Sequence, residues 1–527
     1  MSSTLRPLAL SVPHWPIRCT GSPKALSSRT PFSLLNALRG AFLRLSDNLS
    51  AWSRSAWSES FVRTDSVGIA DDWNTAETWL QHRLNTYDPN LILLGAMTIS
   101  AHGAILAAQF IRKSKCVEAL IVLGGKHVTE TMWVDREGVH IHPGAFSHHA
   151  NQEIDLFVSG DGEEVIAEIG EAVAQTDDAG ITRVDRIKKI VEHLRLSLRN
   201  APGDWALFWF EEGSLKYLCS AGEPARPDDY PIVYEKYPIN ARFPILPGKF
   251  TAHGYSYTSK GCIHRCYFCS ESADINGSVK GLKTAGQRLA RQIARLARVA
   301  ENNNIDSLSV FIEDSILLQG APAALEQFCR ELDQLGTRIK FGGQFTTDMV
   351  LDPKRQRLIS ELVKRGLCYV FMGIETNDDA IAAAMAKYST SIKRQSGNGW
   401  IDRVELAIEE LRANNVDTGV SVLFGLGESQ DLRLSLLRKI AAWQRRLGQP
   451  RVVSLNWAVM HPMRSRSESQ SYTFDRWPVD FNDPRLDIIQ TVFGEASTNF
   501  CLPGCEMASL EELQQIKSQY LQLSNEV

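Results

Sequence analysis

Three cysteines stand within eight residues of one another near the middle of the chain. Cys262, Cys266 and Cys269 have the spacing CxxxCxxC. Thiolates are the usual ligands of iron–sulfur clusters, and three of them in one loop can wrap a single cluster. A [4Fe-4S] cluster held by three cysteines keeps one iron without a protein ligand, and a cofactor or substrate can bind at that iron.

A zinc ion is the main alternative for this motif. Structural zinc sites are usually closed by four ligands. His264 lies inside the same tight loop, and no downstream pair of Cys or His completes a ribbon or finger spacing. The spacing therefore favours an iron–sulfur cluster, with the three cysteines as both metal ligands and catalytic centre.

A second CxxxC, formed by Cys501 and Cys505, lies near the carboxyl end. An auxiliary cluster normally needs four ligands, and the sequence offers no further close pair. A pair that lines an active site and a pair of inert thiols both stay open. The ten cysteines are spread irregularly without a secretory signal, which favours reduced thiols and a cytoplasmic protein.

Length and composition limit the class of protein. A chain of 527 residues is too long for one ordinary core, so two or three domains are expected. Its 44% apolar and 22% charged residues are typical of a globular protein. A net charge of −4 predicts no nucleic-acid surface, and no apolar run is long enough to span a bilayer.

The first 46 residues have two interpretations. They contain six Lys or Arg and no acidic residue, as an organelle transit peptide can. The apolar run Leu8–Val12 can equally be the first strand of a domain. We favour the strand, because the segments that follow form an α/β pattern that needs it.

Residues 1–175 alternate short apolar runs with helical patterns, which predicts an α/β fold. Near-continuous apolar strands with helices between them indicate a parallel sheet covered on both faces, in a Rossmann-like domain. The strands are expected at Leu8–Val12, Leu91–Leu94, Ala119–Leu123 and Asp155–Val158. Residues 176–250 are predicted to be a linker with a β-hairpin, formed by Trp205–Phe210 and Leu215–Leu218.

Residues 251–462 contain a second α/β pattern. If the segment before Cys262 is counted, six strands alternate with helices, which predicts a partial (β/α)6 barrel with chemistry at the carboxyl ends of its strands. The later strands are expected at Leu308–Ile312, Arg338–Phe341, Leu367–Ile374, Thr418–Phe424 and Val452–Val459. Residues 463–527 form a C-terminal extension.

The segment from about Gly254 to Pro462 resembles the radical S-adenosylmethionine (SAM) superfamily. The family motif is CxxxCx(aromatic)C, and Phe268 takes the aromatic place. In that family the open iron chelates the amino and carboxylate groups of SAM. The reduced cluster cleaves SAM to a 5′-deoxyadenosyl radical, which abstracts hydrogen from a substrate.

Three further segments follow in the order of that family. Glu313 and Asp314 resemble the acidic end of the second strand, where a carboxylate binds the SAM ammonium. Glu375 and Thr376 resemble the fourth-strand segment near the SAM ribose and carboxylate. Gly425 resembles the glycine of the adenine-contacting turn after the fifth strand. Each segment is commonplace by itself, but in this order they support one another.

The first domain resembles the cobalamin-binding-type domain that precedes many radical SAM domains, with its patterns GGxHxT and GEGE. Small residues at strand ends let a flat cofactor approach the backbone. The DxHxxG loop that supplies an axial histidine to cobalt in some relatives is absent, so cobalamin binding stays open. The resemblance places the cofactor near Ser100, Gly124, Gly125, His127, Gly160 and Gly162.

The resemblance implies a radical SAM enzyme that uses a [4Fe-4S] cluster, SAM and cobalamin to methylate an unactivated carbon of a biosynthetic intermediate. Oxidation, cyclisation or rearrangement without cobalamin is the alternative, and a non-catalytic iron–sulfur protein is a third. The expected partners are a small-molecule or peptide substrate and an electron donor such as flavodoxin or ferredoxin. Arg464 and Arg466, after the sixth strand, suit an anionic substrate or a solvated loop.

Overall fold

The protein is described here from a computed structural model, which divides into two compact units with the boundary between Pro238 and Ile239. The described residues are 4–11, 34–58, 65–66, 73–142, 153–176, 181–223, 225–256, 262–264, 266–271, 281–387, 399–460, 483–494, 496 and 501–523. Arg464 and Arg466 lie outside these ranges, so the expectation for that loop stays a prediction.

The first unit is built on a seven-stranded sheet in the order β2-β1-β3-β4-β7-β8-β9. The first five of these strands are parallel, and β8 and β9 continue the sheet in antiparallel pairing. Their bounds are β1 (Pro7–Ser11), β2 (Asp65–Ser66), β3 (Leu91–Gly95), β4 (Leu120–Gly124), β7 (Leu156–Gly160), β8 (Trp205–Glu211) and β9 (Ser214–Cys219). The hairpin expected in a linker therefore lies at one edge of the first sheet.

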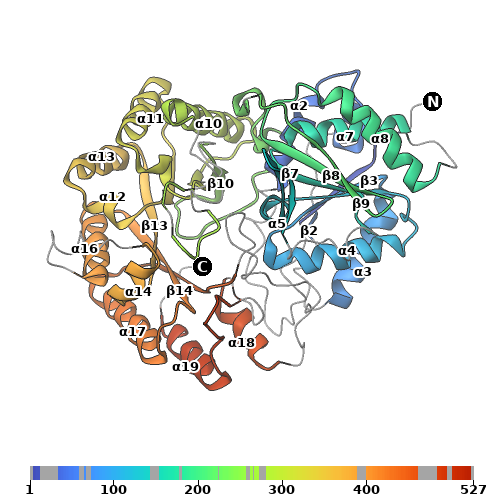
Figure 1. The fold of residues 1–527 in the computed structure, drawn as a ribbon. Coiled ribbons are helices and arrows are strands. Elements are labelled where there is room, and N and C mark those ends of the chain that lie inside the picture. Colours follow the sequence, from blue (N-terminus) through green and yellow to red (C-terminus); the bar gives the residue numbers. More distant parts are fainter. Residues whose placement is uncertain are drawn as a thin grey trace. The chain divides into compact units, whose positions relative to one another are not determined.

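Helices cover both faces of this sheet. Figure 1 shows α2 (Arg39–Arg44), α7 (Glu163–Thr176) and α8 (Arg183–Ser197) on one face, and α3 (Trp73–Tyr87) and α4 (Ala101–Arg112) on the other. The strands β3, β4 and β7 are buried except at their last residue, which is the pattern of a sheet covered on both sides. The α/β fold expected for this region is confirmed.

Gly170 of α7 has no room for a side chain. A Cβ atom there would lie 2.3 Å from Cζ2 of Trp52, which is fully buried and donates from Nε1 to the Ala167 carbonyl. We expect Gly170→Ala to lower the free energy of unfolding by about 1–3 kcal/mol, because the core must shift to admit one methyl group. Denaturant titration measures the change.

The control for this prediction is Gly95→Ala. The added Cβ would lie 3.4 Å from Leu34 Cδ1, an ordinary contact, so the change in stability is expected to stay below about 1 kcal/mol. Equal losses in Gly170→Ala and Gly95→Ala would contradict the steric argument.

The second unit contains six parallel strands that pair in chain order. They are β10 (Phe250–Gly254), β11 (Leu308–Ile312), β12 (Lys340–Gln344), β13 (Leu367–Glu375), β14 (Asp417–Phe424) and β15 (Val452–Trp457). The helices α10 (Leu282–Asn302), α11 (Pro322–Leu335), α13 (Pro353–Lys364), α16 (Trp400–Ala413) and α17 (Gln430–Leu447) follow one another round the outside of the curved sheet (Figure 1). The partial (β/α)6 barrel expected for this region is confirmed.

The carboxyl ends of the six strands meet at one edge of the barrel, because strands that run in parallel end on the same side. The C-terminal extension returns to this unit: α19 (Leu510–Tyr520) packs against α17, and Cys501 pairs with Val459 in an isolated antiparallel bridge just after β15. No helix in the described part of the chain combines the length and apolarity that a membrane crossing requires.

Candidate functional site

The loop that carries the three cysteines follows β10. The Cys262 backbone N–H donates to the Glu271 carbonyl at 2.6 Å, and the Cys269 N–H donates to the Cys266 carbonyl at 3.1 Å. The thiol of Cys262 also accepts a hydrogen bond from the His264 backbone N–H at 3.4 Å. The described residues of the loop are thus held by their own backbone, with all three cysteines half-buried.

The three cysteines supply three thiol donors, which suit an iron–sulfur cluster. Within the described ranges, no group of three or more His, Cys, Asp or Glu side chains is placed to hold a metal ion. Three soft thiol donors also disfavour magnesium or calcium, which prefer oxygen ligands.

Burial dominates the acidity of the three thiols. It raises the pKa of Cys262 and of Cys266, and it raises the pKa of Cys269 to about 12. A thiolate is the ligating form, so binding of iron must displace these protons. A metal or cluster bound by this loop would therefore require its deprotonation.

The first carboxylate at the barrel edge, Glu313, is positioned by a histidine. Nδ1 of the buried His253 on β10 lies 2.6 Å from Glu313 Oε1, and the Glu313 backbone N–H donates to the Gly254 carbonyl at 2.8 Å. The Glu313 side chain remains 22% exposed, so it can still meet a ligand. The sequence identified Glu313 as a candidate but gave no signal for the role of His253.

Asp314 has a different environment from its neighbour. It is buried, and its two carboxylate oxygens accept hydrogen bonds from the backbone N–H groups of Ser256 at 2.8 Å and Leu318 at 3.2 Å. Burial raises the pKa of Asp314. These contacts make Asp314 a residue that fixes the backbone just before the cysteine loop and in the connection after β11.

The connection after β11 also holds the cysteine loop. Oε1 of the buried Gln319 accepts a hydrogen bond from the Ile263 N–H at 3.1 Å, and Ser315 Oγ donates to Glu271 Oε2 at 3.3 Å. Leu318 and Gln319 have φ of +48° and +57°, in the left-handed region that non-glycine residues rarely adopt. Such strain persists where the surrounding structure determines the conformation. Nothing in the sequence pattern identified Gln319.

Glu375 and Thr376 lie at the carboxyl end of β13, where both are buried. The strand register shifts between Gly373 and Glu375, and Glu375 has φ of +58°. Glu375 Oε1 lies 3.0 Å from Lys387 Nζ, while Thr376 Oγ1 accepts a hydrogen bond from the Asp378 N–H at 3.1 Å. Lys387 was not among the residues that the sequence singled out.

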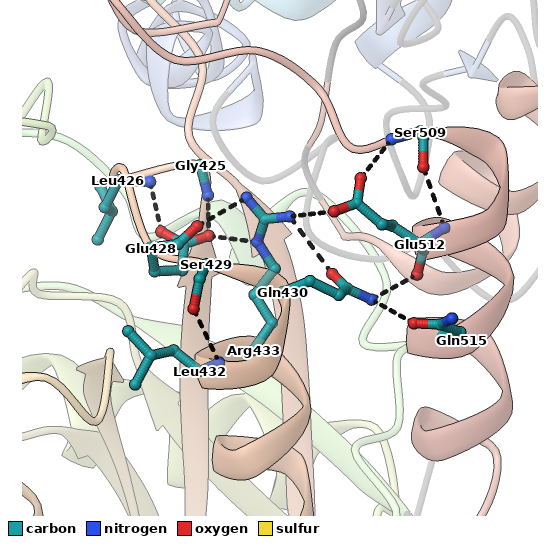
Figure 2. A network of polar contacts seen from close by, with 10 residues as sticks. All are labelled: Gly425, Leu426, Glu428, Ser429, Gln430, Leu432, Arg433, Ser509, Glu512 and Gln515. Atoms are coloured by element: carbon teal, nitrogen blue, oxygen red, sulfur yellow. Dashed lines mark hydrogen bonds and ion pairs between the residues drawn. The ribbon is translucent and has the colours of Figure 1, made fainter.

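The glycine turn after β14 is shaped by a carboxylate from the same turn (Figure 2). Oε1 and Oε2 of Glu428 accept hydrogen bonds from the backbone N–H groups of Gly425 and Leu426, each at 2.8 Å. Gly425 has φ of +82°, and a Cβ atom there would lie 2.4 Å from Trp457 Nε1. Glycine is therefore required at 425 by both the backbone and the neighbouring indole.

Figure 2 also shows how the C-terminal extension reaches this turn. Arg433 of α17 donates from Nε to Glu428 Oε1 at 2.7 Å, and its Nη1 lies 4.0 Å from Glu512 Oε1 of α19. Gln430 Nε2 donates to the Glu512 carbonyl and to Gln515 Oε1. The extension is therefore part of the structure that positions the turn.

Phe268 and the second cysteine pair approach the same apolar cluster. Phe268 and Cys505 both pack against the cluster formed by Leu426, Ala458 and Leu502, at the carboxyl end of the barrel. Burial raises the pKa of both Cys501 and Cys505, and both thiols are free of disulfides. Cys505 thus lies beside the glycine turn after β14 and not on a distant surface.

In the first unit, two of the predicted glycines are required by the backbone. Gly125 and Gly160 have φ of +99° and +84°, and a Cβ atom at either would lie within 2.6 Å of a backbone carbonyl oxygen. At Gly124 and Gly162 the nearest atom would lie 3.5 Å and 3.4 Å away, an ordinary contact. Packing within the chain therefore does not explain the glycine at 124, which is half-exposed at the end of β4.

Ser100 and His127 have partners inside the first unit. Ser100 Oγ accepts a hydrogen bond from the Met97 N–H at 2.9 Å. The fully buried His127, on α5 (Lys126–Thr131), places Nδ1 3.1 Å from Thr98 Oγ1. These residues follow β3 and β4, and Gly160 and Gly162 follow β7, so the structure brings the predicted set to one edge of the sheet.

Comparison with known proteins matches the second unit to one family. The model of the radical SAM superfamily matches residues 256–440. A curated relative, the uncharacterized methyltransferase PH0819 of Pyrococcus horikoshii, is 23% identical over 334 residues, or 61% of this chain. The match spans 58% of that relative, which is less than two thirds of its length.

Two solved structures are similar over most of the chain. One is the radical SAM methyltransferase TsrM from Kitasatospora setae with cobalamin and a [4Fe-4S] cluster bound, with a TM-score of 0.48 and 15% identity. The match covers 86% of this chain and 76% of TsrM. The other is the cobalamin-dependent radical SAM enzyme OxsB with aqua-cobalamin bound, with a TM-score of 0.49 and 15% identity. This match covers 83% of this chain and 52% of the OxsB chain.

Proposed function

We propose, from the radical SAM superfamily domain that residues 256–440 form, that this chain is an enzyme that reductively cleaves SAM at a [4Fe-4S] cluster. The observation that carries the proposal is the position of Cys262, Cys266 and Cys269 at the barrel edge where Glu313 and Gly425 also lie. When bound, such a cluster supplies the electron that cleaves SAM to methionine and a 5′-deoxyadenosyl radical.

The residues of this chain position the cofactor. The Glu313 carboxylate, oriented by His253, accepts hydrogen bonds from the SAM ammonium, because a fixed carboxylate suits a fixed cation. The turn at Gly425, held in shape by Glu428, receives the adenine. Phe268, which belongs to the cysteine loop, packs against the apolar cluster that contains Leu426. Exclusion of water by these side chains protects a reactive radical.

We further propose that the reaction is a cobalamin-dependent methyl transfer to a carbon atom of a small molecule or peptide. The GGxHxT pattern at one sheet edge and the half-exposed Gly124, whose glycine is not required by packing within the chain, support a flat cofactor there. The name of the Pyrococcus horikoshii relative supports methyl transfer. The proposal includes a cytoplasmic location and an electron donor of the flavodoxin or ferredoxin class.

Radical chemistry without cobalamin is the second candidate. Ser100 and His127 have bonding partners within the unit, which is also what a domain used as scaffold would have. Oxidation, cyclisation or rearrangement would then be the outcome. The two candidates differ in one measurable property, the binding of a corrinoid.

The test is anaerobic reconstitution with iron, sulfide and cobalamin, followed by desalting and a UV–visible spectrum. We expect the corrinoid to remain bound in about one equivalent, and SAM with dithionite to yield 5′-deoxyadenosine. Formation of 5′-deoxyadenosine by a protein that retains no corrinoid would favour the second candidate. Absence of both iron and 5′-deoxyadenosine would reject the whole proposal.

Gly124→Val gives a sharper version of the corrinoid test. The larger side chain fills the surface where the cofactor approaches, so we expect retained corrinoid to fall at least about tenfold. Iron content and 5′-deoxyadenosine formation should persist, because the cysteine loop belongs to the other unit. Because this iron reports only on the second unit, an unchanged circular dichroism spectrum is the control for folding of the first unit. Full corrinoid retention in Gly124→Val would contradict the proposed cobalamin site.

A further inference from the structure

Lys387 lies beside the cysteine loop, on the segment that follows α14 (Asp379–Ala384). Its backbone N–H donates to the Ala382 carbonyl at 2.9 Å. Two residues earlier, the Met385 carbonyl accepts a hydrogen bond from the Tyr267 N–H at 3.2 Å, which ties this segment to the loop between Cys266 and Cys269. Met385 also packs in the same apolar cluster as Phe268. The segment that carries Lys387 is therefore fixed against the cysteine loop.

The ammonium group of Lys387 is held in place. Nζ lies 3.0 Å from Glu375 Oε1, and the two side chains are 20% and 9% exposed. A Cβ atom at Gly373 would lie 2.8 Å from Nζ and 2.1 Å from Glu375 Oε1, so the strand leaves space here for the ion pair. A bulge in β13 and a left-handed Glu375 turn the carboxylate toward this space.

We propose that the Lys387 ammonium raises the reduction potential of the [4Fe-4S] cluster. It thereby favours the electron transfer to the cluster that starts the reaction. The inference rests on the proposed function, since it requires the cluster. An electron added to a cluster is stabilised by a nearby positive charge, and partial burial strengthens that interaction. Net charge and hydrogen bonding near the sulfurs are the means by which proteins adjust such potentials.

The electrostatics of the loop agree with this position. The Lys387 charge is near enough to interact electrostatically with Cys266. It interacts in the same way with Cys262 and Cys269. One cation therefore acts on all three cysteines, although Glu375 neutralises part of its charge.

Negative charges near the loop act in the opposite direction. The Glu375 carboxylate interacts with Cys266, and the Glu271 carboxylate interacts with Cys262 and Cys269. Reduction adds a further negative charge to this environment. The positive charge of Lys387 opposes that accumulation at each of the three cysteines.

The experiment is an anaerobic redox titration of the reconstituted full-length protein without SAM, followed by electron paramagnetic resonance of the reduced cluster. In Lys387→Gln, the amide can still donate to Glu375 but the charge is lost. We expect the ratio of reduced to oxidised cluster at a fixed potential to fall about tenfold, a shift of about 59 mV to more negative potential. Lys387→Arg keeps the charge and should titrate close to the unaltered protein.

A double variant separates two effects of losing Lys387: the loss of its positive charge and the exposure of the Glu375 negative charge that it neutralised. Lys387→Gln with Glu375→Gln removes both, and its potential should remain more negative than that of the unaltered protein, because the cation has the larger influence on the loop. A return to the unaltered value would overturn the proposal, since Lys387 would then only neutralise Glu375. Lys364→Met, which removes a lysine whose side chain is 69% exposed on α13, is the control for remote charge.

Iron content separates this inference from the proposed function. A cluster that forms in the unaltered protein and shows the same potential in Lys387→Gln overturns the role of Lys387 and leaves the enzyme assignment intact. Failure of the unaltered protein to form any cluster overturns both. If Lys387→Gln does not retain iron, Lys387→Met is titrated in its place. The same shift to more negative potential is expected, and an unchanged potential overturns the role of Lys387.

Discussion

Replacing Cys262, Cys266 and Cys269 together by Ala should abolish formation of 5′-deoxyadenosine from SAM and dithionite. The reason is that these three thiols, in one loop after β10, are the proposed ligands of the cluster. Without the cluster no electron can reach SAM, so the product should fall to the background of a reaction without protein. Iron analysis and chromatography of the nucleoside products measure the two effects.

Cys219→Ala is the matched control for this variant. Cys219 is an exposed thiol on β9 in the other unit, so its loss should change neither iron content nor product. Because the three cysteines lie in a loop after β10 and in no helix or strand of the barrel, the triple variant should also keep its circular dichroism spectrum. Persistent 5′-deoxyadenosine in the triple variant would contradict the assignment to radical SAM chemistry.

The arrangement of strands could be predicted from the sequence, because each strand is short, apolar and bounded by polar residues or glycine. The predicted limits of Leu308–Ile312 agree with β11, and those of Leu91–Leu94 differ from β3 by one residue. Buried parallel strands have this pattern since both of their faces meet helices. The two-residue strand β2 is too short to give a pattern, and the helix α8 was missed although its apolar residues Ile190, Val191 and Leu194 have helical spacing.

The positions of the candidate site residues were predictable, but their partners were not. Glu313 and Glu375 could be located because they end strands of a parallel sheet. Their contacts with His253 and Lys387 depend on the fold, since His253 precedes Glu313 by 60 residues and lies on another strand. The side-chain roles of Asp314 and Glu428, which both bind backbone N–H groups, likewise arise from local turns that no spacing rule specifies.

Truncating Glu428 to Ala should destabilise the second unit by about 3–5 kcal/mol, because it leaves a buried guanidinium without its carboxylate. The side chains of Glu428 and Arg433 are 3% and 9% exposed, and Arg433 also stacks over the Trp457 ring at 4.7 Å. The same change removes the acceptor for the Gly425 and Leu426 N–H groups. Denaturant unfolding followed by tryptophan fluorescence measures the loss, with Trp457 as a local reporter.

Glu409→Ala provides the matched control, since it breaks an ion pair to Arg446 that lies on the surface. Those two side chains are 38% and 52% exposed, and an exposed pair contributes at most about 1 kcal/mol. Removing both buried partners, in Glu428→Gln with Arg433→Met, should cost less than Glu428→Ala because no charge is left buried. Similar small losses in Glu428→Ala and Glu409→Ala would mean that water reaches Arg433, and the turn at Gly425 would then not depend on this ion pair.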